Sequence, residues 1–263
     1  MSRFSSPEEE WRAFLNGVHP RINPRSVFRL IPSGPRCKQC RAPFGAPGRW
    51  VMRRLGFTPW EKNPNICRFC LTKLRGNEGV GAEVELSLMF ADVRGSSRLA
   101  RSMSPSDFRR LMSRFYEAAT DVLIEHDALL DKFVGDQSIG LFVPGIAGPD
   151  HPRRAIDAAE ALLERTGHRS GEGPWIPLGS SVHTGTAYVG TVFTRGEISD
   201  FTALGDAVNV AAHLCSHAGV GEVLVTEAAA TPAGLSVERL EGRRLSLKGH
   251  PVMARVLPAR VER

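Results

Sequence analysis

Two aspartates about 44 residues apart have the settings best suited to chemistry in this chain. Asp92 ends a run in which apolar residues alternate, and Asp136 in Lys-Phe-Val-Gly-Asp precedes the apolar run Ser-Ile-Gly-Leu-Phe-Val. These patterns predict strands, with both carboxylates at a strand end or hairpin tip. Such a pair suits Mg²⁺ or Mn²⁺ bound together with phosphate oxygens, because these ions take only one or two protein carboxylates. The alternative is that each aspartate simply caps a turn.

Four motifs follow one another in the C-terminal two thirds of the chain. They are Asp92-Val-Arg-Gly-Ser-Ser, Lys132-Phe-Val-Gly-Asp136, His183-Thr-Gly and Phe201-Thr-Ala-Leu-Gly-Asp-Ala-Val-Asn209-Val-Ala-Ala. In this order and spacing the chain resembles the class III nucleotide cyclase catalytic domain, the domain of adenylate and guanylate cyclases, over about residues 82–258. The resemblance implies an α+β, ferredoxin-like domain with an antiparallel-rich sheet covered by helices. It also implies a head-to-tail dimer with active sites at the interface.

The resemblance assigns roles to the motif residues. Asp92 and Asp136 would bind two Mg²⁺ or Mn²⁺ ions in one protomer, and the other would contribute Lys132, Thr202 and Asn209. The ribose 3′ oxygen would attack the α-phosphate and expel pyrophosphate, one metal making the hydroxyl acidic and the other neutralising the leaving phosphates.

The base specificity that the resemblance implies depends on two of these residues. The family's lysine donates to adenine N1, and the residue at position 202 accepts from the N6 amine. Guanine reverses these donors and acceptors, and guanylate-type enzymes are expected to carry Glu at position 132. Lys132 with Thr202, which stands where Asp is more usual, therefore favours ATP.

The segment 205–215 predicts a helix whose apolar stripe is Val208, Ala211, Ala212 and Cys215. Asn209 and His213 then share another face, one turn apart. The resemblance implies that Asn209 orients the ribose and that His213 stands at the position of an arginine that stabilises the transition state. Histidine is shorter and largely neutral at pH 7, and losing one such donor costs about a hundred- to a thousand-fold in rate.

Gly179 is a second departure, because many relatives carry a phosphate-binding arginine at this position. We therefore expect one of three outcomes: slow turnover, a heteromeric partner that brings the arginine, or a nucleotide-binding domain that has lost catalysis.

Gly95, Ser96 and Ser97 form a small-residue turn after the first predicted strand. Their backbone N–H groups are candidates to face a triphosphate, although such a turn is also common as a plain loop. Next, Ser104-Pro-Ser-Asp predicts the start of a helix, with an N-cap serine and proline at the first position. A second helix is predicted over about residues 152–166.

Four cysteines, Cys37, Cys40, Cys67 and Cys70, form a CxxC…CxxC pair in the N-terminal part. This is the spacing of four thiolates around one structural Zn²⁺, and so short a segment has little core of its own. An iron–sulfur cluster also uses four cysteines and stays open. Disulfides are disfavoured because no secretory signal sequence is evident.

Charge divides the chain into two parts. Residues 1–80 contain 15 Lys and Arg against 5 Asp and Glu, whereas residues 81–263 contain 19 against 23. A basic module with Arg49, Trp50, Arg53 and Arg54 could bind nucleic acid or dock in cis on the acidic domain, and the further alternative is a solvated basic face.

We therefore expect three regions: a helical or irregular segment over 1–36, a basic zinc module and glycine-marked linker over 37–80, and the cyclase domain over 81–260. In the first region, Trp11, Phe14 and Leu15 suit a short helix that packs on a partner protomer. No apolar run reaches the roughly 20 residues that a membrane span needs, so we expect a cytoplasmic protein with no membrane partner.

The function predicted from the sequence is conversion of ATP to 3′,5′-cyclic AMP and pyrophosphate by a homodimer, or by a heterodimer with another cyclase. A second possibility is a catalytically weak or inactive nucleotide-binding protein that regulates a partner. A third is a zinc-dependent nucleic-acid binder that carries a relic cyclase domain.

Overall fold

Long strands with alternating side chains build most of this protein. The computed structural model describes residues 4–19, 28, 30–31, 34–60, 63–70, 81–194, 197–247 and 250–257. The strands are β1 (Pro59–Trp60), β2 (Asn63–Cys67), β3 (Gly81–Val93), β4 (Leu129–Val134), β5 (Gln137–Phe142), β6 (Leu178–Thr194), β7 (Glu197–Leu204), β8 (Val223–Thr226), β9 (Glu241–Leu247) and β10 (His250–Leu257). The helices are α1 (Pro7–Leu15), α3 (Arg49–Arg54), α5 (Ser96–Ser102), α6 (Pro105–Glu125), α7 (Pro144–Ala147), α8 (His151–Arg165), α9 (Asp206–Ser216) and α10 (Glu227–Ala230), with a 3₁₀ turn at Val237–Arg239.

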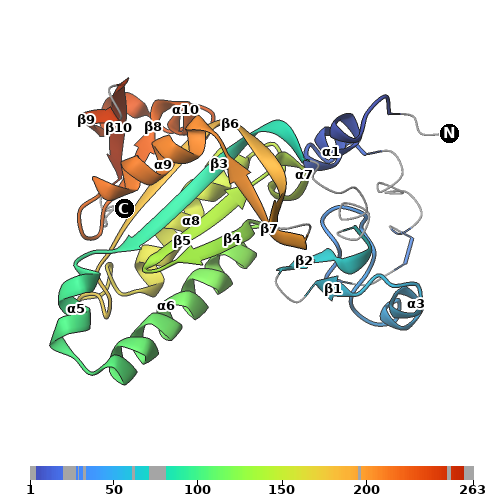
Figure 1. The fold of residues 1–263 in the computed structure, drawn as a ribbon, viewed down its shortest axis with the longest axis horizontal. Helices are drawn as coiled ribbons and strands as arrows, with labels where there is room; N and C mark the ends of the chain where they lie inside the picture. The colour runs from blue at the N-terminus through green and yellow to red at the C-terminus, as the bar shows by residue number, and fades with distance from the viewer. Residues whose placement is uncertain are drawn as a thin grey trace.

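One large sheet carries the order β4-β5-β3-β6-β8-β10-β9, and β7 pairs with the far end of β6. All of its pairings are antiparallel except β6 with β8, which is parallel. The small strands β1 and β2 form a separate hairpin beside the cysteine-rich part (Figure 1). The expected α+β fold with an antiparallel-rich sheet is thus confirmed.

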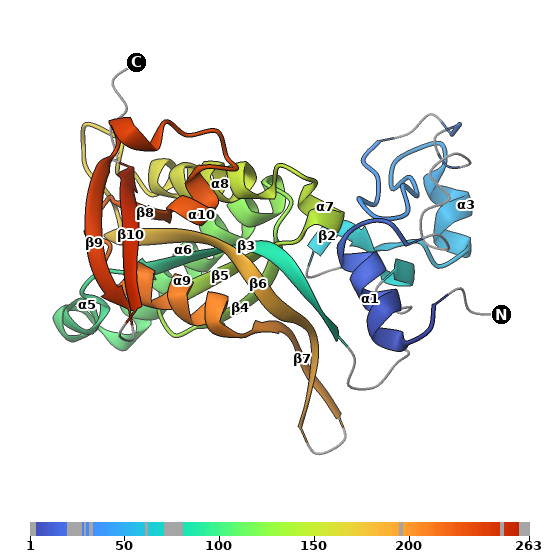
Figure 2. The ribbon, with the colours of Figure 1, turned by 90° about the horizontal axis from the view of Figure 1, so that it is seen from above.

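The two faces of β3 pack against different helices, because successive side chains of a strand point to opposite faces. Met89 and Ala91 belong to the core under α6 and α8. Leu88 and Phe90 belong to a second core, which includes buried residues of α1 and α9. Figure 2 shows the helices α6 and α8 separated from α9 by the sheet. By the same alternation, Asp92 lies on the α9 face.

The helices begin where the sequence predicts. Ser104 caps α6 by accepting a hydrogen bond from the Asp107 N–H at 3.1 Å, with proline at the first helical position. The predicted helix over residues 152–166 is α8, whose buried stripe of alanines, isoleucine and leucines packs on β3 and β6.

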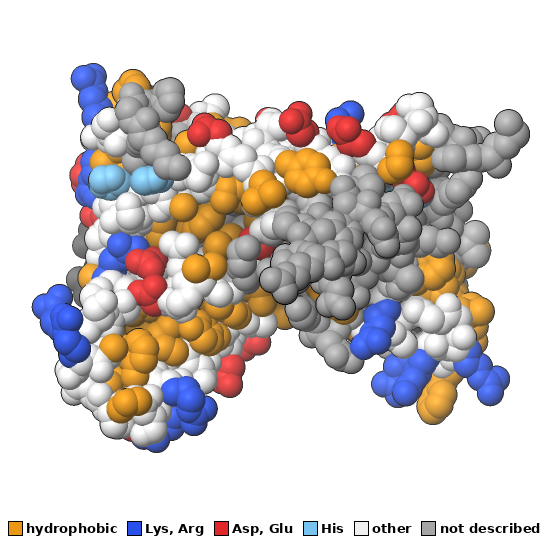
Figure 3. Space-filling view, viewed as in Figure 1, with side chains coloured by type: hydrophobic (Ala, Val, Ile, Leu, Met, Phe, Trp, Pro, Cys, Tyr) orange, Lys and Arg blue, Asp and Glu red, His pale blue; other side chains and the backbone are white. Residues whose placement is uncertain are grey.

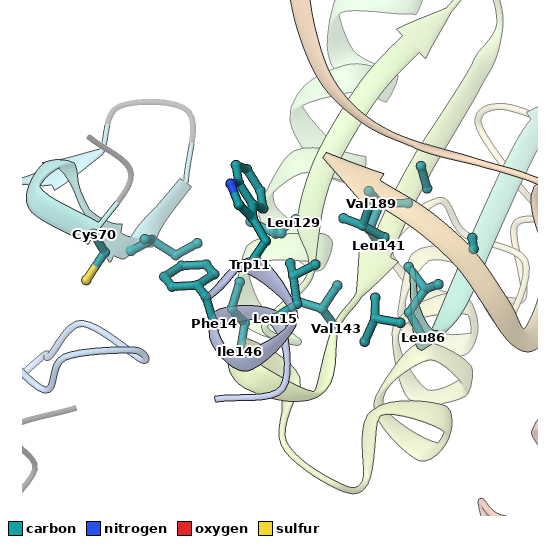
Figure 4. Packing of buried hydrophobic residues seen from close by; sticks show 14 of the residues in the cluster. Trp11, Phe14, Leu15, Cys70, Leu86, Leu129, Leu141, Val143, Ile146 and Val189 are labelled. Carbon is teal, nitrogen blue, oxygen red and sulfur yellow. The ribbon is translucent and has the colours of Figure 1, made fainter. Parts of the chain in front are cut away.

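Helix α1 packs on its own chain. Ser6 caps it, and its apolar stripe of Trp11, Phe14 and Leu15 is at most 2% exposed. These side chains lie against β3 and α7, beside Leu86 and Ile146 (Figure 4). The prediction of a short helix is confirmed, but the expectation that it packs on a partner protomer is wrong, because this stripe is already buried against β3 and α7 of the same chain.

The structure leaves the predicted linker untested, because residues 71–80 lie outside the described residues. Within the described ranges, no helix combines the length and apolar character that crossing a bilayer requires.

Trp11→Ala is expected to lower the free energy of unfolding by about 3–5 kcal/mol, because it empties a fully buried indole site. Trp50→Ala is the matched control, since Trp50 is 71% exposed and its loss leaves no cavity. Urea denaturation of both variants measures the difference. Equal stability losses would contradict the packing of α1 on β3.

Candidate active site and cysteine cluster

Asp92 and Asp136 lie at one end of the sheet. Asp92 is the next-to-last residue of β3 and stands opposite Gln137 of β5, while Asp136 lies in the tight turn between β4 and β5. The Val93 N–H donates to the Asp136 carbonyl at 3.2 Å, which ties this turn to the end of β3. The prediction that both carboxylates stand at a strand end or hairpin tip is confirmed.

The turn that presents Asp136 is braced by α6. Its preceding residue, Gly135, has a φ of +61°, a left-handed conformation that glycine adopts without strain. Tyr116 Oη donates to the Gly135 carbonyl, and the Tyr116 ring stacks on Phe133 with centroids 4.4 Å apart. Asp136 therefore stands on a turn that is held in place by the amphipathic helix α6.

Arg94 pairs with Asp92, and sequence reasoning did not single it out. Its Nη2 lies 2.7 Å from Asp92 Oδ2, and the guanidinium also donates to the carbonyls of Cys215 at 3.1 Å and Ser216 at 3.3 Å. Arg94 lies two residues after Asp92, in the turn that directly follows β3, so its nearness in sequence was a usable signal.

Gly179 has no space for a side chain. A Cβ built there would lie 2.9 Å from Arg94 Nε and 2.9 Å from the carbonyl oxygens of Ala218 and Gly219. Gly179 stands opposite Asp92 in the β3–β6 pairing. At position 179, where the resemblance leads us to expect an arginine, the space beside the glycine is thus taken by Arg94, the residue that directly follows β3.

The charge at Asp92 is costly in this fold. Burial raises the pKa of the Asp92 carboxyl, the Arg94 guanidinium lowers it, and the negative charge of Asp136 raises it further, with a net upward shift. Two neighbouring carboxylates that repel each other at a partly buried strand end suit a divalent cation, and their oxygen donors fit Mg²⁺ or Mn²⁺.

A cavity of about 440 Å³ opens beside Asp136. Gly95, with a φ of +70°, precedes the first turn of α5, and Ser96 and Ser97 stand at the cavity wall. Apart from the turn before β5, the rest of the lining is mostly apolar and comes from the same helix α5 and from α6. The lining residues are Ser96, Ser97, Ala100, Phe108, Met112, Tyr116, Gly135 and Asp136. The predicted phosphate turn and one predicted metal ligand thus share a cavity.

The two predicted base-contacting positions lie on β4 and β7, two strands that are not paired in the sheet but touch each other. Thr202 on β7 is 4% exposed, and its Oγ1 donates to Asp131 Oδ2 on β4 at 2.9 Å. Lys132 is the next residue of β4, although its side chain lies outside the described residues. Among the described residues, no hydrogen bond or ion pair links Asp92 or Asp136 with Thr202.

The predicted helix over 205–215 is α9, but its apolar stripe is rotated from the predicted one. Its buried residues are Ala207, Ala211, Leu214 and Cys215, while Val208 and Ala212 are only partly buried. The reason is that α9 packs on β8 and β10 through Leu214 as well as on β3 and β6. Asn209 is exposed and His213 is half-buried, so both remain on the side away from the core.

Two other reactive side chains of the domain are inert in this setting. Burial lowers the pKa of His183 to about 4, so its ring is neutral at pH 7, and Nδ1 lies 2.9 Å from Thr226 Oγ1. Burial raises the pKa of the Cys215 thiol to about 12. Neither residue is therefore poised for acid–base or nucleophilic chemistry at neutral pH.

The four N-terminal cysteines converge as predicted. Their sulfurs lie within 4.8 Å of one another, with Cys37 Sγ 3.9 Å from Cys70 Sγ and Cys40 Sγ 3.6 Å from Cys67 Sγ. All four are free thiols with at most 1% exposure. A tetrahedral zinc with Zn–S bonds of about 2.3 Å separates its sulfurs by about 3.8 Å, so this donor set fits Zn²⁺.

The cysteine module docks on the turn between α6 and β4. Asp127 in this turn is 4% exposed and has a φ of +64°. Its Oδ2 lies 3.0 Å from Lys38 Nζ of the first CxxC and 2.7 Å from Arg154 Nη1 of α8. Asn65 Nδ2 donates to Asp127 Oδ1 at 3.3 Å, and Asn63 Nδ2 donates to the Ala128 carbonyl at 2.6 Å. The module is therefore anchored directly ahead of β4.

This contact in cis does not use the basic cluster that the sequence drew attention to. Arg49, Arg53 and Arg54 are exposed, as is Trp50. Figure 3 shows basic and hydrophobic side chains together over the α3 region. Docking through Lys38, rather than through these arginines, leaves the cluster on the surface.

The arrangement described above is that of a nucleotide cyclase domain. The family described as "Adenylate and Guanylate cyclase catalytic domain" matches residues 81–254, about two thirds of the chain. The chain belongs to this family.

Curated relatives match the same region. An uncharacterised protein of Mycobacterium tuberculosis is 33% identical over 175 residues, which cover 65% of this chain and 31% of that protein. "Adenylate cyclase 1" of Rhizobium meliloti is 29% identical over 135 residues, 49% of this chain and 20% of that protein. "Adenylate cyclase" of Anabaena cylindrica is 29% identical over 142 residues, 52% and 28% respectively. The matched segments thus span about a third or less of these relatives.

Solved structures share the fold. The guanylyl cyclase Cya2 aligns with a TM-score of 0.59 at 21% identity, covering 67% of this chain and 92% of that chain. The adenylyl cyclase CyaB from P. aeruginosa aligns with a TM-score of 0.58 at 21% identity, covering 68% and 97%. The first is a guanylyl cyclase and the second an adenylyl cyclase, so the fold does not decide the base.

Purified protein is expected to carry about one Zn²⁺ per chain, because four buried thiolates at these separations form one tetrahedral site. Elemental analysis measures the metal, and replacement by Co²⁺ should give the visible absorption of a tetrahedral thiolate site. Cys67→Ser should lose the metal, whereas Cys215→Ser should keep it. Stoichiometric iron with sulfide would contradict the zinc assignment and favour an iron–sulfur cluster.

Proposed function

We propose that this domain converts ATP to 3′,5′-cyclic AMP and pyrophosphate. The observation that carries the proposal is the meeting of Asp92 and Asp136 at one end of the sheet, beside Arg94 and the Ser96–Ser97 wall of the cavity. A site with two carboxylates, a fixed guanidinium and small residues in the wall of a cavity is suited to a metal-bound triphosphate.

The chemistry is an internal displacement on the nucleotide. The ribose 3′ oxygen loses its proton and forms a bond to the α-phosphorus, while the bond from that phosphorus to the bridging oxygen breaks and pyrophosphate leaves. Asp92 and Asp136 would hold the divalent ions, which supply Lewis acidity to the hydroxyl and charge neutralisation to the leaving phosphates. The N–H groups at Ser96 and Ser97 would bind phosphate oxygens.

Arg94 is the residue that we assign to the gap left at Gly179. Its guanidinium is anchored by the Cys215 and Ser216 carbonyls, which fixes its direction relative to Asp92. In this position the Arg94 guanidinium offsets the negative charge of the Asp92 and Asp136 carboxylates while no metal is bound. A fixed cation at this place fits a domain that still handles a triphosphate.

The base and ribose would be held by Lys132, Thr202 and Asn209 of a second protomer. The exposure of Asn209 and the absence of a bond or ion pair from it to Asp92 or Asp136 within the described ranges support a site completed by a second copy. A heterodimer with another cyclase would complete it equally well, and would bring the arginine that His213 replaces.

We also propose a regulatory role for the zinc module, formed by residues 37–80. Lys38 and Asn65, which flank the metal ligands in sequence, hold Asp127 at the start of the segment that carries Lys132. Loss of the metal would free this turn. It would thereby also loosen β4, the strand that carries Lys132. Docking of the module on the catalytic domain favours this role over a nucleic-acid binder with a relic domain.

Asp92→Asn and Asp136→Asn are each expected to reduce Mn²⁺-dependent cyclic AMP formation by at least about a thousandfold, because each removes a charged metal ligand. The assay is production of cyclic AMP from labelled ATP. Asp121→Asn is the control, because that carboxylate is 65% exposed on α6 and has no role in the proposed mechanism.

Stability separates this role from a structural one. Because the pKa of Asp92 is raised in the folded protein, its ionised form costs stability at pH 7, and the Asn variant without metal should unfold at an equal or higher denaturant concentration. Full activity in both variants would refute the metal assignment.

His213→Arg is expected to raise the rate about tenfold or more, because a guanidinium supplies a permanent charge to the transition state where histidine does not. His217→Arg, an exposed change just beyond α9, is the matched control and should leave the rate unchanged. If the His213 variant folds, dimerises and shows the parent rate, another group already fills this role and the assignment of His213 is wrong.

A further inference from the structure

Asp131 is a carboxylate that neither the motifs nor the proposed mechanism uses. In the β4–β5 pairing, Leu130 stands opposite Gly140 and Phe133 opposite Ser138, so β4 contains one extra residue at Asp131–Lys132. Such a bulge re-aims side chains locally and bends the strand. It is here that Asp131 Oδ2 lies 2.9 Å from Thr202 Oγ1 on β7.

The direction of this hydrogen bond follows from the groups that make it. Thr202 Oγ1 is the donor, because the carboxylate oxygen Asp131 Oδ2 accepts. A hydroxyl has one proton and two lone pairs, and the remaining lone pairs of Thr202 can only accept. Thr202 is 4% exposed and β-branched, which restricts its rotation about χ1.

We propose that Asp131 is a specificity-determining residue that fixes Thr202 as a hydrogen-bond acceptor for the nucleotide base. The inference rests on the proposed function, in which Thr202 meets the base edge. Adenine presents its N6 amino group as a donor, and guanine presents O6 as an acceptor. An accepting Thr202 therefore pairs with adenine, whereas guanine O6 would face a lone pair.

The competing explanation is that Asp131 only braces β7 against β4. A brace would affect ATP and GTP alike, because both carry the same ribose and triphosphate. The ratio of the two substrates is thus the measurement that a purely structural role leaves unchanged.

Asp131→Asn tests the proposal with almost no change in shape. The Asn amide N–H₂ can donate to Thr202 Oγ1, which releases the threonine proton toward the base and makes guanine O6 acceptable. The ratio of kcat/KM for ATP to that for GTP should fall by about tenfold or more, the effect of one mispaired hydrogen bond. Asp131→Ala, which lets the hydroxyl turn either way, should move the ratio toward one.

Thr202→Val completes a double-mutant cycle. It removes the hydroxyl and should lower the same ratio, and adding Asp131→Asn to it should have no further effect, because the two residues act as one unit. Binding of fluorescent ATP and GTP analogues to each variant gives the ratio even where turnover is slow.

The outcomes separate this inference from the proposed function. If the parent protein neither binds nor converts ATP, the proposed function fails. If the parent prefers ATP and both Asp131 variants keep its ratio, the inference fails while the proposed function stands. A parent that prefers GTP would contradict the accepting role of Thr202. Circular dichroism checks that each variant folds. If one of the two Asp131 variants does not fold, the comparison uses the other Asp131 variant.

Discussion

The antiparallel pairing of β3 with β5 on one side and β6 on the other is the constraint on which the candidate site depends. It sets Asp92 opposite both Gln137 and Gly179, which fixes the carboxylate beside the turn that carries Asp136. The two faces of β3 pack into different cores, so a slip of one residue would exchange Leu88 and Phe90 with Met89 and Ala91 between these cores and disrupt the packing of both. The position of the acids is therefore a consequence of core packing.

The same packing explains how the site tolerates its charge. Asp92 is partly buried beside a second carboxylate, and Arg94 from the same strand end offsets it while lying over Gly179. A side chain at position 179 would meet two backbone carbonyls as well as Arg94. Gly179 and Arg94 are thus complementary features of one arrangement. Because Arg94 supplies a guanidinium at this place, the absence of an arginine at position 179 matters less for the charge of the site.

The N-terminal part is integrated into the domain rather than appended to it. Its four cysteines belong to the same buried cluster as α1 and the α9 face of β3. Lys38 and Asn65 then meet Asp127, a buried acid in a turn with positive φ. A metal that orders the cysteines would therefore also order the entry to β4, which gives the proposed regulation a physical route.

Local patterns in the sequence predicted the elements well. Alternation before Asp92, the Ser104 cap and the CxxC spacing each report on neighbours within a few residues, and each was confirmed in the fold. Contacts between distant segments could not be read this way. The hydrogen bond from Thr202 to Asp131 joins residues 71 apart in the sequence. The packing of α1 on β3 depends on which apolar part of the sheet the other helices leave uncovered. The buried stripe of α9 differs from the predicted one for the same reason, because Leu214 packs against residues of the distant strands β8 and β10.

The most direct test of the central claim is to locate Mn²⁺ by anomalous scattering in crystals grown with a non-reactive ATP analogue. The account predicts metal peaks in contact with both Asp92 and Asp136, next to the triphosphate, in a site whose base is held by a second protomer. Metal bound away from these two carboxylates, or a triphosphate bound elsewhere with this strand end empty, would contradict it.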